Sequence, residues 1–199
     1  MQDLQSSRYV GILLAGGRGV RFDPSGTLDK LQQLLPDKRS VAAMAATNLL
    51  GVLPQVVAVV RPGAGTLARE LGQLGCEVVV CDNAASGMAC SLLRGLLHAP
   101  DAAGWVIALA DMPFVQPATI LALVAALAAG AEIAVPVYQG IRGNPVAFAS
   151  ARLPALLQLT GDEGARSILK KSCVTEVRVL DPGVRQDIDT PGDLRQAYP

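Results

Sequence analysis

The sequence predicts an α/β fold in which a mostly parallel, mixed β-sheet lies between two layers of helices, a three-layer sandwich. Strand-length apolar runs alternate with segments of helical pattern along the chain. Several runs, such as QVVAVV and WVIALA, are apolar at nearly every position, as expected of strands buried on both faces. The polar, glycine-containing segment QGIRG at residues 139–143 predicts a hairpin-like turn, so part of the sheet is expected to be antiparallel.

The expected elements follow one another without an internal repeat or a linker, and we predict a single domain over residues 1–199. The expected strands are residues 9–14, 55–60, 77–81, 105–110, 132–138, 145–148 and 175–180. The expected helices are residues 40–50, 65–74, 87–97, 117–129, 152–159 and 164–171.

Composition argues against several classes of protein. The 17 basic and 17 acidic residues balance, which disfavours a broad nucleic-acid-binding surface. The longest apolar tracts are rich in alanine and fall short of the roughly 20 strongly apolar residues of a membrane span. The opening MQDLQSSRY has no apolar signal core, and the four cysteines form no C-x-x-C pair. We therefore expect a cytoplasmic protein with reduced thiols and neither a nucleic-acid nor a membrane partner.

The segment LAGGRGVRF at residues 14–22 carries the first functional signal. It follows the first expected strand, and ligands of open α/β sheets bind beyond the carboxyl ends of the strands. Glycines let backbone N–H groups approach an anion, while Arg18, Arg21 and the later Lys30 can contact phosphate oxygens. The segment does not match G-x-G-x-x-G, because Phe22 stands where the third glycine belongs. From composition alone, a phosphate-binding loop and an exposed connector are both open.

A carboxylate stands at the end of the expected strand WVIALA, where Asp111 begins the sequence DMP. This position suits a ligand of Mg²⁺ better than it suits core packing. The alternative is a helix N-cap, but the next helix is expected to begin later, near Pro117. Metal binding is therefore the preferred interpretation.

Further polar groups follow other apolar runs. Ser86 and Gly87 precede an expected helix, whose free N–H groups could bind an anion or could simply be capped. In QDIDTPGDL, Asp187 and Asp189 are two residues apart and would face the same way in an extended segment. One of them could complete a metal site with Asp111, and the other could cap a helix that begins near Pro191.

The motifs LAGGRGVRF with Asp29-Lys30, SGMACSL, ADMP, GNPVAF, GDEGAR and DIDTPGDL, which extend from about Val10 to Leu194, form a recognisable set. As a set they resemble the MobA-like NTP transferases, most closely the molybdenum-cofactor cytidylyltransferase branch. The resemblance implies a Rossmann-like nucleotide-diphospho-sugar transferase fold. It also implies transfer of a nucleoside monophosphate from CTP or GTP to a molybdopterin-type acceptor, with release of pyrophosphate and with Mg²⁺ as cofactor.

The resemblance also implies roles for individual residues. Arg21, Lys30 and Asp111 would be catalytic, and a molybdoenzyme or its chaperone would be a further partner. The implied nucleotide-binding residues are Leu14, Ala15, Gly16, Gly17, Arg18, Arg21, Lys30, Ser86, Gly87, Met88 and Ser91. The implied acceptor-binding residues are Gly143, Asn144, Pro145, Asp162 and Arg166, and the implied metal ligands are Asp111 with Asp187 and Asp189.

Two departures from the branch leave alternatives open. The cytidylyltransferase branch usually reads LAAG in the first loop, whereas this chain reads LAGG as the guanylyltransferase branch does, so CTP and GTP are both candidates. Asn144 replaces a histidine that usually precedes Pro-Val, and asparagine cannot gain a charge near neutral pH. A sugar-phosphate or isoprenoid-type nucleotidyltransferase and a non-catalytic nucleotide- or cofactor-binding accessory protein are the alternative functions.

Overall fold

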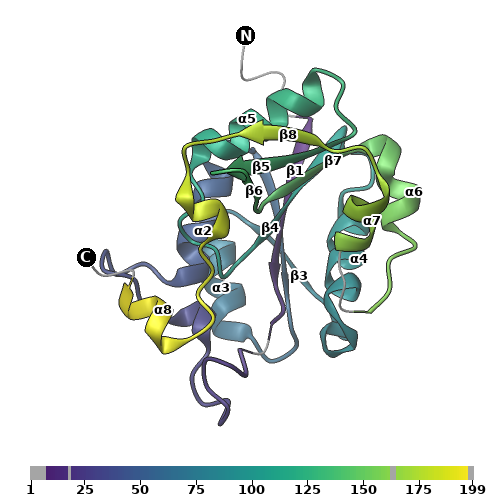
Figure 1. The fold of residues 1–199 in the computed structure, drawn as a ribbon. Helices are drawn as coiled ribbons and strands as arrows, with labels where there is room; N and C mark the ends of the chain where they lie inside the picture. Colours follow the sequence, from purple (N-terminus) through teal and green to yellow (C-terminus); the bar gives the residue numbers. More distant parts are fainter. Residues whose placement is uncertain (1–7, 18, 162–164, 197–199) are drawn as a thin grey trace.

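The computed structural model describes residues 8–17, 19–161 and 165–196. Within them, eight strands form a single mixed sheet with helices on both of its faces (Figure 1). This arrangement confirms the predicted fold class.

One half of the sheet is parallel. Its strands are β1 (Tyr9–Ala15), β2 (Gln55–Val60), β3 (Glu77–Val80) and β4 (Gly104–Leu109), in the spatial order β3-β2-β1-β4. The carboxyl ends of these strands consequently lie along one edge, where ligands of open α/β sheets bind.

The other half is mixed. It contains β5 (Ile133–Tyr138), β6 (Ile141–Arg142), β7 (Val146–Ala149) and β8 (Thr175–Arg178). Strand β7 joins the two halves because it pairs antiparallel with both β4 and β5, while β8 runs parallel to β5. The predicted hairpin is confirmed, and its turn is two residues long, with Gln139 and Gly140 at φ of 50° and 78°.

The helices form two layers, as Figure 1 shows. Helices α2 (Val41–Leu50), α3 (Gly65–Gln73) and α5 (Pro117–Ala128) cover one face. Helices α4 (Met88–His98), α6 (Leu153–Leu156) and α7 (Arg166–Lys171) lie on the other. The remaining elements are α8 (Pro191–Gln196) and the 3-10 turns η1 (Lys30–Gln32), η2 (Ala84–Ser86), η3 (Ser150–Arg152) and η4 (Pro182–Arg185).

Alternation along the central strands divides the core between these layers. In β1, Leu13 belongs to the cluster shared with α2, α3 and α5, whereas its neighbour Ile12 belongs to the cluster shared with α4. Both side chains are fully buried. A sheet that is covered by helices on both faces thus requires strands that are apolar at nearly every position, as the sequence predicts.

Two elements differ from the sequence-based expectations. The helix expected over residues 152–159 ends at Leu156, because Gln158 and Leu159 make i→i−3 rather than i→i−4 backbone hydrogen bonds. The segment expected to be only a turn at 139–143 contains the two-residue strand β6. Among the described residues, no helix has the length and apolarity needed to cross a membrane.

The loop after β4 depends on a close backbone contact. A Cβ on Gly183, in η4, would lie 2.1 Å from the carbonyl oxygen of Phe114. We expect Gly183→Ala to lower the free energy of unfolding by about 1–3 kcal/mol, the cost of overpacking a filled interior. Urea denaturation measures this change. Gly65→Ala is the control, because its added Cβ meets no atom within 4 Å, and a similar loss in both variants would contradict the explanation.

Candidate active site

The pairing of β1 with β4 places the glycine-rich loop beside Asp111. Leu14 lies opposite Leu109, and the N–H of Ala110 donates a hydrogen bond to the Leu14 carbonyl at 3.1 Å. Strand β4 ends at Leu109, and β1 ends at Ala15, one residue after Leu14. Gly16 and Asp111 therefore leave the sheet at neighbouring positions. The carboxylate does not cap a helix, because α5 begins after Gln116.

Lys30 projects its ammonium group toward this edge from the η1 turn. Asp29 caps the turn, its Oδ1 accepting a 3.0 Å hydrogen bond from the Leu31 N–H. The Lys30 Nζ donates to Asp111 Oδ2 at 2.7 Å and to Asp189 Oδ1 at 2.8 Å. Lys30 as a whole is only 7% exposed. The two carboxylates therefore neutralise an ammonium that water scarcely reaches.

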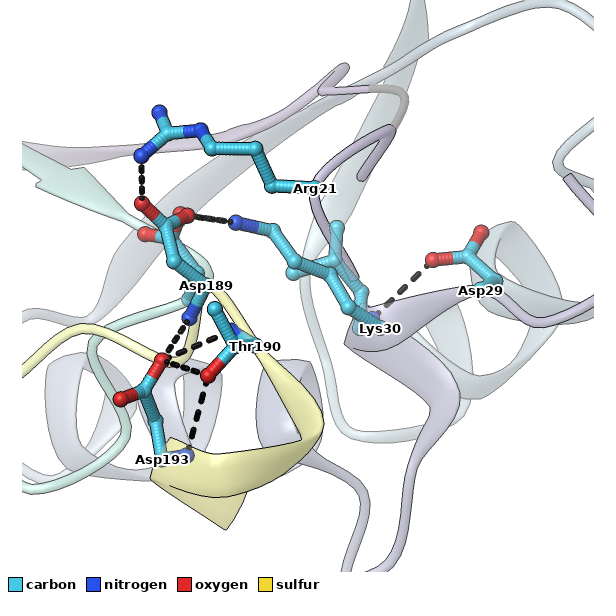
Figure 2. Close-up of polar contacts among 8 residues, drawn as sticks. Arg21, Asp29, Lys30, Asp189, Thr190 and Asp193 are labelled. Atoms are coloured by element: carbon cyan, nitrogen blue, oxygen red, sulfur yellow. Dashed lines mark hydrogen bonds and ion pairs between the residues drawn. The ribbon is translucent and has the colours of Figure 1, made fainter. Parts of the chain in front are cut away.

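Asp189 reaches the site through the backbone of its neighbour. The Ile188 N–H donates a 2.8 Å hydrogen bond to the Asp111 carbonyl oxygen, and the Ile188 side chain is buried. The second carboxylate oxygen of Asp189 pairs with Arg21 Nη1 at 2.5 Å, and Figure 2 shows Arg21 and Lys30 both directed at this carboxylate.

Helix α8 begins at Pro191, two residues after Asp189, and its first turn holds Asp189 in place. The Asp193 Oδ2 accepts hydrogen bonds from the Asp189 and Thr190 N–H groups and from the Thr190 hydroxyl (Figure 2). The predicted cap by Asp187 or Asp189 is therefore replaced by Thr190 and Asp193. The hydrogen bond from the Thr190 side chain, with those from the two N–H groups, lowers the pKa of Asp193 below its ordinary value.

The ion pairs also set the protonation of Lys30. Burial acts to lower the pKa of the Lys30 ammonium, but attraction to Asp111 and hydrogen bonds to both carboxylates outweigh it. The pKa is consequently raised above its ordinary value. Lys30 is thus a permanent cation at neutral pH.

These groups line a cavity of about 460 Å³, which we call the main cavity. Its volume falls within the range of small-molecule sites. It is lined by Leu14, Gly16, Gly17, Gly19, Val20, Arg21, Lys30, Leu31, Ala84, Ala85, Gly87, Met88, Ser91, Leu109, Asp111 and Asp189. Of the residues predicted to bind nucleotide, Ala15 instead packs in the core, Ser86 lies outside the lining, and Arg18 lies outside the described residues.

The start of α4 forms one wall of the main cavity. Gly87 precedes the helix with a φ of 117°, a conformation that favours glycine. Ser91 is buried, and a Cβ on Gly16 would come within 3.0 Å of its hydroxyl oxygen. The first loop can therefore approach α4 this closely because residue 16 is a glycine.

A second cavity of about 270 Å³, the side cavity, adjoins the first. The two share Leu14, Arg21, Met88 and Leu109 as walls. The side cavity is otherwise mostly apolar, with Asn144 and Arg166 as its further polar residues. Of the other residues predicted to bind the acceptor, Gly143 and Pro145 do not line it, and Asp162 lies outside the described residues.

One carboxylate oxygen in the main cavity has an unused capacity to bind. Asp111 Oδ1 is buried and makes no hydrogen bond within the described residues. Those residues contain no group of three or more acidic, histidine or cysteine side chains arranged as a complete metal cage. Mg²⁺ is ordinarily held by one or two carboxylates together with substrate phosphates, so Asp111 and Asp189 fit it. Asp187 is exposed and does not line the main cavity.

Sequence reasoning missed Arg61. It directly follows β2, and its Nη2 pairs with Asp29 Oδ2 at 2.9 Å. Arg61 also lines a third cavity of about 440 Å³, the loop cavity, which lies beside Gly16 and shares Val20, Ala84 and Ala85 with the main cavity. Its place at the carboxyl end of a parallel strand was the available signal.

A glycine-rich loop, a buried ammonium and paired carboxylates meet at the carboxyl edge of the parallel strands, which is where the class of open α/β nucleotide-binding proteins holds its ligands. Comparison with known proteins gives the family. Residues 11–177 match the MobA-like NTP transferase domain, and this protein belongs to that family.

Two relatives support the assignment. The purine catabolism protein PucB of Bacillus subtilis (strain 168) is 31% identical over 201 residues, covering 94% of this chain and 95% of PucB. Rv0371c from Mycobacterium tuberculosis H37Rv superposes with a TM-score of 0.82 at 28% identity, covering 96% of this chain and 97% of that one. Rv0371c in complex with manganese gives a TM-score of 0.77 at 28% identity, over 95% and 97% of the two chains.

A further solved structure is similar in fold. It is the molybdopterin-guanine dinucleotide biosynthesis protein A from Archaeoglobus fulgidus, with a TM-score of 0.68 at 23% identity over 94% of this chain and 96% of that one.

Replacing Lys30 with methionine removes the cation between two carboxylates. We expect the free energy of unfolding at neutral pH to fall by about 2 kcal/mol. The roughly 3–5 kcal/mol of a fully buried pair is not expected, because the Asp111 and Asp189 side chains are 22% and 21% exposed. Chemical denaturation measures the change, with Lys30→Arg as the charge-conserving control. A Lys30→Met protein as stable as the wild type would show that the ion pairs contribute nothing.

Proposed function

We propose that this protein transfers a nucleoside monophosphate from CTP or GTP to a molybdopterin-type acceptor and releases pyrophosphate. The observation that carries the proposal is the 2.7 Å contact between Lys30 and Asp111 within the main cavity. Lys30 and the candidate metal ligand Asp111 could have opened onto different faces of the molecule, and instead they meet. An NTP substrate follows from the family, and the ordered motifs support the finer assignment of the acceptor.

The glycine-rich loop would hold the triphosphate. Gly16, Gly17 and Gly19 line the main cavity and can bring backbone N–H groups close to phosphate oxygens. Lys30 and Arg21 would place positive charge against the α-phosphate and the leaving pyrophosphate. Ser91, buried at the start of α4, would add a hydroxyl on the opposite wall.

Asp111 and Asp189 would hold Mg²⁺, with the buried Asp111 Oδ1 as the oxygen that has no other partner among the described residues. A bound divalent ion would neutralise charge on the nucleotide and acceptor oxygens. The structure of the relative Rv0371c with manganese supports a divalent ion in this family. Asp187 remains a candidate ligand from the sequence, although its exposed position favours Asp189.

In the proposed reaction, an acceptor phosphate oxygen attacks the α-phosphorus in line. The new oxygen–phosphorus bond forms as the bond to the β-phosphate bridging oxygen breaks, and pyrophosphate leaves with the electron pair. No covalent protein intermediate is required, so the residues act by positioning and by offsetting charge. The remote His98 contacts Glu77 and takes no part in this scheme.

The side cavity would receive the acceptor. Its apolar walls suit a flat organic ring system, while Arg21, Arg166 and Asn144 can contact an anionic group. Because Arg21 lines both cavities, it could contact the acceptor phosphate and the nucleotide together. Asn144 would serve as a neutral hydrogen-bonding group where the related branch has histidine.

Two measurements test the proposal. The first is a thermal-shift panel with Mg²⁺ and CTP, GTP, ATP or UTP, in which a ligand at 100 times its dissociation constant stabilises the fold by about 2.7 kcal/mol. The second is pyrophosphate release with molybdopterin, with sugar phosphates and with an isoprenoid-precursor phosphate as separate acceptors. Pyrophosphate release with molybdopterin, and with none of the other acceptors, supports the proposal. Release with another acceptor, or nucleotide binding without release, favours the alternative enzymes or an accessory protein.

Asp111→Asn should reduce pyrophosphate release about 10²- to 10³-fold, the loss that follows removal of one charge-stabilising group. The shape of the side chain is retained, but Lys30 loses one of its two carboxylate partners, so a modest fall in the melting temperature should accompany the loss of turnover. Asp189→Asn and Asp187→Asn separate the two remaining candidate ligands, and we expect the larger loss from Asp189→Asn. Wild-type turnover by Asp111→Asn would remove this residue from the chemistry.

A further inference from the structure

A second ion pair connects the η1 turn, which carries Lys30, to the end of β2. Arg61, at the end of β2, pairs through Nη2 with Asp29 Oδ2 at 2.9 Å. Their side chains are 33% and 16% exposed, so the pair is only partly open to water. Arg61 does not line the main cavity, although it borders the adjoining loop cavity.

Asp29 is attached to the η1 turn by three hydrogen bonds, which two of its oxygen atoms accept. Its Oδ1 accepts from the Leu31 N–H, while its carbonyl oxygen accepts from the Gln32 N–H at 3.1 Å and from Gln33 Nε2 at 2.9 Å. Each of these bonds reaches past Lys30. The orientation of Asp29 therefore sets the orientation of the backbone from which the Lys30 side chain leaves.

The Lys30 side chain is constrained along its stem as well. A Cβ on Gly19 would meet Lys30 Cγ at 3.3 Å, which shows that the stem passes close to the first loop. The position of the Lys30 ammonium thus depends both on the first loop, which its stem approaches, and on the η1 turn, which Asp29 caps. The only strand-end cation that reaches Asp29 among the described contacts is Arg61.

We propose that Arg61 is a positioning residue that acts through Asp29 to hold the Lys30 ammonium where a nucleotide triphosphate binds. The inference rests on the proposed function, because it assumes that Lys30 meets the nucleotide. Arg61 acts by anchoring the Asp29 carboxylate to the end of β2, which fixes the orientation of the η1 turn.

The two residues can be altered separately. Asp29→Asn retains an oxygen that can accept from Leu31 and so preserves the cap, but it removes the charge that binds Arg61. Arg61→Gln removes the cation and leaves Asp29 in place. Arg61→Lys keeps a positive charge and tests rescue by the conservative residue.

The readout is the dissociation constant of CTP and of GTP with Mg²⁺, measured by calorimetry without an acceptor. Asp29→Asn and Arg61→Gln should each weaken binding about tenfold, at the lower end of the range for groups that orient a ligand-contacting residue. Because both substitutions break the same contact, the double variant should bind the nucleotide no more weakly than the weaker-binding single variant does. Arg61→Lys should recover part of the loss.

Arg152→Gln is the matched control. Arg152 is 27% exposed and pairs with Glu132 at 2.5 Å, and it lines none of the three cavities. A merely structural role for Arg61 predicts that Arg61→Gln, like Arg152→Gln, lowers the melting temperature without changing nucleotide affinity.

Three results would overturn the positioning role. One is nucleotide affinity unchanged in Arg61→Gln. Another is a loss in Arg61→Gln but not in Asp29→Asn, which would mean that Arg61 contacts the nucleotide itself. The third is additive losses in the double variant. Since binding is measured without an acceptor, absence of pyrophosphate release overturns only the proposed transfer, whereas absence of nucleotide binding by the wild type overturns both.

Discussion

The buried ammonium of Lys30 is the constraint on which the site depends. Removing a cation from water is costly unless charged partners surround it. The partners of Lys30 are Asp111 and Asp189, which lie 81 and 159 residues further along the chain. Their contacts with Lys30 join the η1 turn, the end of a central strand and the segment before α8. The sheet register, the Ile188–Asp111 hydrogen bond and the Thr190–Asp193 cap all serve to bring these three parts together.

Much of the fold could be predicted because its local signals agree with its global arrangement. The uniformly apolar β1 and β2 read as strands because both faces of the sheet are covered, and β2 was predicted with the observed bounds. Helix α2 was predicted from its pattern over residues 40–50, and in the structure Ser40 Oγ caps it by accepting from the Ala43 N–H. The weaker elements, β6 and α6, are short enough that tertiary contacts decide their extent.

The site was less predictable because its parts meet only after folding. Position at a strand end correctly placed Gly16 and Asp111 in the main cavity, since strand ends are local features. The sequence could not show which of Asp187 and Asp189 lines the main cavity. Both are acidic and two residues apart, and the segment that carries them is not part of a strand in the structure. The Arg61–Asp29 pair was also missed, because an arginine after a strand does not reveal a partner 32 residues earlier.

The backbone hydrogen bond from Ile188 to Asp111 has a consequence for local stability. Every described strand lies within residues 8–178, so the segment that carries Asp189 adds no strand to the sheet and is attached by contacts that include this hydrogen bond. If the segment detaches while the sheet stays folded, Lys30 keeps one carboxylate partner instead of two. The second carboxylate of the main cavity can thus be withdrawn by a local opening that leaves the framework intact.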